Sequence, residues 1–191
     1  MFLLPLGFIP LLGYSVAATR SAAMEPQDGP PAWRFSARLL SDGAAVALTI
    51  ALMTAPFALL AIWLAGALSA PGLWHSTDPL LHVEGWTSAI LILALPWGIA
   101  LLLVMPHATA RFASTGRLGD LLNFSASLRM VRRDFATWNI AIAAIVTAWA
   151  IGLACASLVC VGAVPGIFYA ILVSAHATAT LHAEDEDPSA G

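Results

Sequence analysis

The most constraining feature of the sequence is a run from Phe135 to Ala183 that contains no Asp, Glu, Lys or Arg. A transmembrane helix needs roughly 20 mostly apolar residues, so this run is about twice as long as one bilayer crossing requires. Its one cluster of helix-breaking residues is CVGAVPG, at 160–166. The run therefore predicts two membrane helices, near 136–159 and 165–182, joined by a tight hairpin turn.

Two further uncharged runs precede it, from Gly43 to Ala70 and from Thr87 to Met105. Each is long enough for one crossing, which predicts spans near 44–69 and 87–105. Ser41, Asp42 and Gly43 stand directly before the first of these spans. Because Ser and Asp side chains often accept hydrogen bonds from the first N–H groups of a helix, we expect the N-cap of that helix here.

The overall composition fits a membrane protein. Hydrophobic residues make up 60% of the chain and charged residues 10%, whereas about a quarter of the residues in a soluble domain are charged. We therefore expect a single membrane domain over 1–191, an all-α, polytopic transmembrane helical bundle with four clear spans. Because a basic face on a soluble domain is missing, nucleic acid is not an expected partner.

The opening stretch, MFLLPLGFIPLLGYSVAATR, is apolar but short for a straight span, and it contains Pro5 and Pro10. A signal peptide normally has a basic n-region, and no basic residue precedes Arg20. We therefore predict a short or kinked first membrane segment near 2–18 rather than a cleaved leader.

All arginines fall in two connectors, 19–43 and 106–134. Short loops rich in Lys and Arg generally face the cytoplasm, so both connectors are expected on that side. The loop 71–86 has no arginine and is expected to face outward. With five membrane segments, the N-terminus lies outside and the acidic tail 183–191 lies in the cytoplasm. The expected location is the bacterial cytoplasmic (inner) membrane.

The connector 106–134 carries an amphipathic pattern. From Leu118 onward, apolar residues recur at helical spacing beside a basic face. Such an interfacial helix would lie in the headgroup plane and contact anionic lipid or a partner, or would anchor the loop without a specific site. The basic face comprises Arg117, Arg129, Arg132 and Arg133.

Small residues recur every four positions in several spans, including Ala47, Ala51 and Ala55. This spacing is typical of close packing between membrane helices, although an alanine-rich chain also produces such rows by chance. We predict that the rows in the last two spans form a helix-packing interface. These rows are Ala144, Ala148, Gly152 and Ala156 in one helix, and Gly166, Ala170, Ser174 and Thr178 in the other.

His176 is the main candidate for cofactor chemistry, because an ionisable residue inside a span is a functional hypothesis by default. It could ligate a metal or a pigment magnesium, or hydrogen-bond a neighbouring helix. The outward loop also carries His75, Asp78, His82 and Glu84, but their spacing fits no known metal motif. We predict no metal site and no catalytic residues, since the chain has no GxSxG, HExxH or P-loop motif. Bound lipids are expected, and a pigment on His176 is the alternative.

Four segments along the chain carry a family likeness: IPLLGYSVAATR at 9–20, PPAWRFSARLLSDGAAV at 30–46, FASTGRLGDLLNFSASLRMVRRDF at 112–135 and FYAILVSAHATA at 168–179. Their order and spacing resemble the prokaryotic membrane proteins grouped as domain of unknown function 4013 (DUF4013). The resemblance implies a helical membrane fold, and it supplies no established catalytic residues.

These features favour a non-catalytic accessory or scaffold subunit that packs against lipids and other integral membrane protein subunits. Its partner could be a bioenergetic complex, such as a photosynthetic reaction-centre and antenna assembly or a respiratory complex. One alternative is a small-solute or lipid transporter with a polar cavity near Pro56 and Pro96. Another is a cofactor- or pigment-binding subunit that uses His176.

Overall fold

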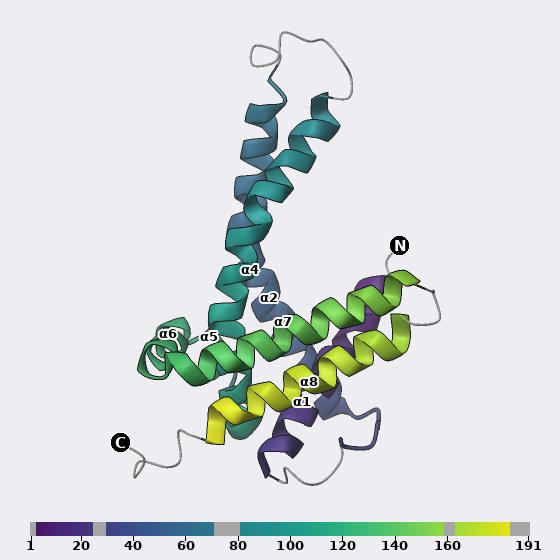
Figure 1. The fold of residues 1–191 in the computed structure, drawn as a ribbon, viewed down its shortest axis with the longest axis vertical. Helices are drawn as coiled ribbons and strands as arrows, with labels where there is room; N and C mark the ends of the chain where they lie inside the picture. The colour runs from purple at the N-terminus through teal and green to yellow at the C-terminus, as the bar shows by residue number, and fades with distance from the viewer. Residues whose placement is uncertain (1–2, 25–29, 71–80, 159–162, 184–191) are drawn as a thin grey trace. The chain divides into compact units, whose positions relative to one another are not determined.

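The computed structural model describes residues 3–24, 30–70, 81–158 and 163–183 (Figure 1). All regular structure in these ranges is α-helical, as α1 (Leu3–Met24), α2 (Ala37–Leu68), α4 (Leu81–Thr115), α5 (Leu118–Leu122), α6 (Phe124–Arg133), α7 (Phe135–Leu158) and α8 (Ala163–Ala183). The all-α fold expected from the sequence is therefore confirmed.

Three helices in the described ranges are long and apolar enough to cross a membrane, judged by length and composition. They are Ala37–Leu68, Val83–Thr115 and Phe135–Cys155. A further apolar helix, Pro165–Leu181, is shorter. These helices fit a multi-pass membrane protein, whereas crossing by α1 and α8 stays a prediction.

The chain divides into two compact units. One contains Met1–Ala47 and Leu103–Gly191, and the other contains Leu48–Leu102. The helices α2 and α4 each contribute residues to both units, since the boundaries between the units fall inside them.

The helix α2 begins at Ala37, before the predicted span. The Ser36 side chain accepts a hydrogen bond from the backbone N–H of Leu39 at 3.1 Å, and so caps this end. The expected N-cap at 41–43 is therefore wrong. Asp42 and Gly43 lie inside the helix and contact residues of α1. A local sequence pattern does not predict such contacts.

The C-terminal end of α4 lies at Thr115, beyond the limit at Met105 that the sequence predicted for this span. Gly116 stops it there with a φ of 69°, and its N–H donates to the Phe112 carbonyl at 2.8 Å. This left-handed cap strongly favours glycine. Phe112 itself is buried, so this last part of α4 is a packed element rather than a free connector.

The predicted amphipathic segment is not one helix. It forms α5 and α6, which are separated at Asn123. The Asn123 side chain accepts a hydrogen bond from the Ala126 N–H at 3.2 Å and caps α6. The two short helices bury Leu121, Ser127 and Val131. The segment is therefore folded onto the protein along one side.

In the unit that contains both termini, α8 packs against both α1 and α7 (Figure 1). The Tyr14 ring stacks on Phe168, with 5.4 Å between ring centroids, and lies 4.6 Å from the Trp33 ring. The Tyr14 hydroxyl donates to the Pro31 carbonyl at 3.1 Å. The apolar core around these rings contains Tyr14, Ala18, Leu39, Ile171 and Ala175.

The unit 48–102 is a hairpin of two antiparallel helical stretches. Gly85 of α4 contacts Ala65 of α2 and Ser69, which directly follows α2, and a side chain at Gly85 would overlap them. Ala51 and Ala55, by contrast, are exposed. The α2–α4 contact at Gly85 uses small residues near the end of the hairpin, and packing of the Ala47, Ala51 and Ala55 row against another helix stays a prediction.

Candidate functional site

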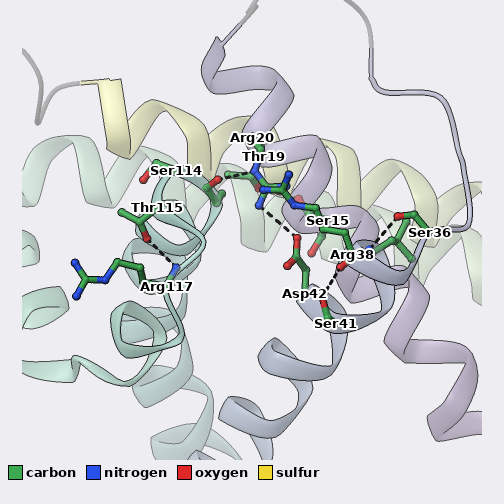
Figure 2. Close-up of polar contacts among 12 residues, drawn as sticks. Ser15, Thr19, Arg20, Ser36, Arg38, Ser41, Asp42, Ser114, Thr115 and Arg117 are labelled. Atoms are coloured by element: carbon green, nitrogen blue, oxygen red, sulfur yellow. Dashed lines mark hydrogen bonds and ion pairs between the residues drawn. The ribbon is translucent and has the colours of Figure 1, made fainter.

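A partly buried arginine joins three helices. Nη2 of Arg20, on α1, lies 3.3 Å from Oδ2 of Asp42 on α2, and the two side chains are 17% and 13% exposed. The Arg20 Nε also donates to the carbonyl of Ala113, near the end of α4, at 2.7 Å. Figure 2 shows Arg20 directed toward Asp42. Because a buried charge is costly without a partner, this pair fixes the relative positions of these three helix ends.

A second arginine, Arg111, holds the short helices in place. Its Nη2 donates to the carbonyls of Asp120 at 2.8 Å and Asn123 at 3.1 Å, and to Oγ of Ser127 at 3.1 Å. The last carbonyls of a helix lack intrahelical partners and carry partial negative charge. Arg111 therefore caps the end of α5, and Thr115 adds a hydrogen bond of 2.6 Å to the Asp120 carboxylate.

The four arginines predicted to form a basic face are all exposed. Arg117 precedes α5, and its backbone N–H donates to Thr115 Oγ1 at 3.2 Å (Figure 2). The other three, Arg129, Arg132 and Arg133, lie on α6. A surface cavity of about 360 Å³ is lined by Ala126, Arg129, Met130 and Arg133. The structure thus places two of the predicted arginines around one cavity.

Two glycines from the predicted small-residue rows meet where α7 crosses α8. A Cβ on Gly152 would lie 2.7 Å from the Gly166 carbonyl oxygen, and a Cβ on Gly166 would lie 2.8 Å from the Gly152 oxygen. Ala170 is fully buried beside them. The two backbones are therefore in direct contact, as close packing between membrane helices requires.

The other members of these rows lie in different surroundings. Ala148 and Thr178 are buried, and the Thr178 hydroxyl donates to the Ser174 carbonyl at 2.7 Å. Ala144 is only half-buried, and the side chain of Ala156 lies outside the described residues. The buried face of α7 follows Ala141, Ile145, Ala148 and Gly152. Its spacing alternates between four and three residues, as expected for packed helices.

His176 is exposed on α8, on the same side as Tyr169 and Thr180. Among the described residues, no group of three or more His, Cys, Asp or Glu side chains could hold a metal ion. Of the loop residues considered as ligands, His75, Asp78 and the side chain of His82 lie outside the described residues.

Polar groups near the two prolines of the hairpin bond to each other. The Trp97 indole Nε1 donates to Thr54 Oγ1 at 3.1 Å, and that hydroxyl donates to the Ile50 carbonyl at 2.7 Å. A cavity of about 310 Å³ lies at the opposite end of the hairpin, lined by Leu68, Val83, Glu84, Gly85, Thr87 and Ser88. The sequence did not predict this cavity, because a single glycine such as Gly85 forms no local pattern that would indicate one.

The sequence of this helical chain matches a protein-family model. The family model described as "Protein of unknown function (DUF4013)" matches residues 1–161. The chain belongs to the DUF4013 family. The match covers α1 to α7 of this DUF4013 protein, so the resemblance noted at 168–179, in α8, lies outside it. No curated protein and no solved structure gives a significant match.

Proposed function

We propose that this DUF4013 protein is a non-catalytic structural subunit that packs against other integral proteins of the bacterial cytoplasmic membrane. Its partner would be a large membrane assembly, such as a photosynthetic or respiratory complex. The protein contributes helix surfaces rather than reacting groups.

The observation that carries this proposal is the exposed surface of the long helices. Only 11% of the most apolar window of α2 and 6% of that of α4 are buried inside the chain. The exposed side chains include Trp63, at 69% exposure, and Trp149 in the middle of α7. Large aromatic residues are enriched in protein interfaces and often dominate their binding energy.

The internal polar contacts support the same proposal. Arg20 and Asp42 pair with each other, Arg111 caps α5, and Trp97 bonds to Thr54. Each of these groups holds one helix against another. These polar side chains therefore stabilise the fold, as expected for a subunit whose role is packing.

The proposed topology places the N-terminus outside and the C-terminus in the cytoplasm. The arginine-bearing segments 19–43 and 106–134 support it, by the positive-inside rule. A reporter that fluoresces only in the cytoplasm, fused at the C-terminus, should be bright.

The proposed function is tested by purifying the tagged protein from its own membranes in mild detergent, followed by mass spectrometry of the intact complex. We expect one or more integral membrane proteins at a fixed stoichiometry. A monodisperse monomer with lipid alone would contradict the proposal.

A second candidate rests on His176. An exposed imidazole on an apolar helix is available to a ligand from outside the chain. A pigment-binding or other cofactor-binding subunit would absorb visible light after purification, and His176→Ala would remove that absorbance. Colourless protein from native membranes would exclude this candidate.

A further inference from the structure

The basic residues of α6 have no polar side-chain partner among the residues that the structure describes. Within the described parts of the chain, Arg129, Arg132 and Arg133 form no ion pair and no side-chain hydrogen bond. Arg129 and Arg133 are one helical turn apart, which puts both on the same face. They line the cavity of about 360 Å³ together with Ala126 and Met130. Two exposed guanidinium groups beside one cavity suit an anion.

The acidic residues of the same segment are already engaged. The Asp120 carboxylate accepts the Thr115 hydroxyl at 2.6 Å, and Oδ1 of Asp134 accepts the Thr137 N–H at 3.1 Å. Neither acid is fully exposed. The charge that the segment presents outward is therefore positive.

The position of α6 in the chain places it next to a membrane surface. Only Asp134 separates Arg133 from Phe135, the first residue of a candidate span. Exposed apolar side chains lie on both sides of the arginines along the chain, at Phe124, Leu128 and Phe135. A basic segment with exposed apolar residues is typical of helices that lie in the headgroup layer.

We infer that the Arg129–Arg133 pair of α6 binds the phosphate of an anionic phospholipid headgroup. Guanidinium groups form charge-assisted, often bidentate hydrogen bonds to phosphate oxygens. The neighbouring apolar side chains enter the boundary of the acyl chains. The site is separate from the helix-packing surfaces, so it does not depend on the proposed function.

The acidic segment Glu184–Asp187 of the same chain is the main competing occupant by charge. It has no apolar residue that could cover Phe124 or Leu128, whereas a lipid has acyl chains. The exposed apolar side chains beside the arginines therefore favour the lipid.

The test uses the full chain in a zwitterionic detergent, titrated with phosphatidylglycerol or with phosphatidylcholine of the same acyl chains. Bound lipid is counted by native mass spectrometry. The variant is R129Q/R133Q, and the matched control is R34Q/R38Q, which removes two other exposed arginines. Circular dichroism checks that both variants keep the helical content of the parent protein.

We expect R129Q/R133Q to bind phosphatidylglycerol about 25-fold more weakly in low salt, since each basic residue at an anionic surface contributes about fivefold. The control should change by less than about twofold, because Arg34 and Arg38 do not line the cavity. Phosphatidylcholine should bind weakly to all three proteins, and millimolar inorganic phosphate should not displace phosphatidylglycerol.

Three results would overturn the inference. Equal losses in the two double variants would mean that only total charge matters. Displacement of phosphatidylglycerol by millimolar inorganic phosphate would identify a free anion as the ligand. An effect of R129Q/R133Q that appears only after residues 184–191 are deleted would identify the acidic segment as the occupant.

Discussion

Arg20 of α1 and Asp42 of α2 form an ion pair of 3.3 Å whose side chains are less than one-fifth exposed. The same guanidinium donates to the Ala113 carbonyl, so a single cation connects three helices. Removing one partner of a buried pair leaves an uncompensated charge, which is more costly than the pair itself is favourable.

Substitutions of Arg20 and of Asp42 should therefore lower the free energy of unfolding by different amounts. Arg20→Met should lower the free energy of unfolding by about 3 kcal/mol, because Asp42 loses its cation and the Ala113 carbonyl its donor. Asp42→Asn should cost less, since Arg20 keeps its backbone acceptor. Denaturant unfolding in micelles, arranged as a double-mutant cycle, measures both. A loss below about 1 kcal/mol for Arg20→Met, as at an exposed ion pair, would argue against a structural role.

Gly13 allows α1 and α2 to cross in backbone contact. A Cβ there would overlap the Leu39 carbonyl oxygen, so Gly13→Ala should destabilise the protein by about 2 kcal/mol through overpacking. Gly66→Ala is the matched control, because nothing lies within 4 Å of its new Cβ. It should be neutral or stabilise by up to about 1 kcal/mol, from helix propensity alone. Similar results for the two variants would contradict the close crossing.

Gly152 performs the same role between α7 and α8. Its missing Cβ would lie 2.7 Å from the Gly166 carbonyl oxygen, so Gly152→Ala should cost about 1–2 kcal/mol as the two helices move apart. Gly98→Ala, with open space around the new Cβ, provides the control. Thermal unfolding of both variants in one detergent is sufficient, and a Gly152→Ala protein as stable as Gly98→Ala would count against the contact.

Arg111→Met removes the Nη2 group that donates to two carbonyls and one hydroxyl. Opening of α5 and α6 should become easier by about 2 kcal/mol, because the two N–H hydrogens of Nη2 are shared among these acceptors and each contributes roughly 1 kcal/mol. Hydrogen exchange should then accelerate about 30-fold for amides in 118–133, with α8 unchanged. Unchanged exchange in 118–133 would mean that burial of Leu121 and Val131 alone holds these helices.

Hydropathy predicted the helices well because the thickness of the bilayer sets how long an uncharged run must be. The break between α7 and α8 also follows from local chemistry, since Pro165 is tolerated only in the first turn of a helix. The family resemblance drawn from the sequence agrees with the match over 1–161.

Helix ends and polar contacts could not be predicted in the same way. Asp42 and Gly43 have the residue types of an N-cap, yet one pairs with Arg20 and the other meets the Ile9 carbonyl. These contacts depend on where α1 lies, which no local pattern encodes. Similarly, four-residue spacing identified Gly152 and Gly166, but it also identified Ala51 and Ala55, which are exposed. Alanine rows occur by composition alone, whereas glycine at a crossing is required by the backbone contact.

The most direct test of the structural-subunit proposal is site-specific photo-crosslinking in native membranes. A benzophenone amino acid at position 63, the exposed tryptophan of α2, should give a discrete adduct with one integral membrane protein. The same probe at position 124, beside the arginines of α6, should give lipid adducts and serves as the control. Protein adducts at position 63 that survive dilution of the membranes would support the account. Lipid adducts alone at position 63 would contradict it.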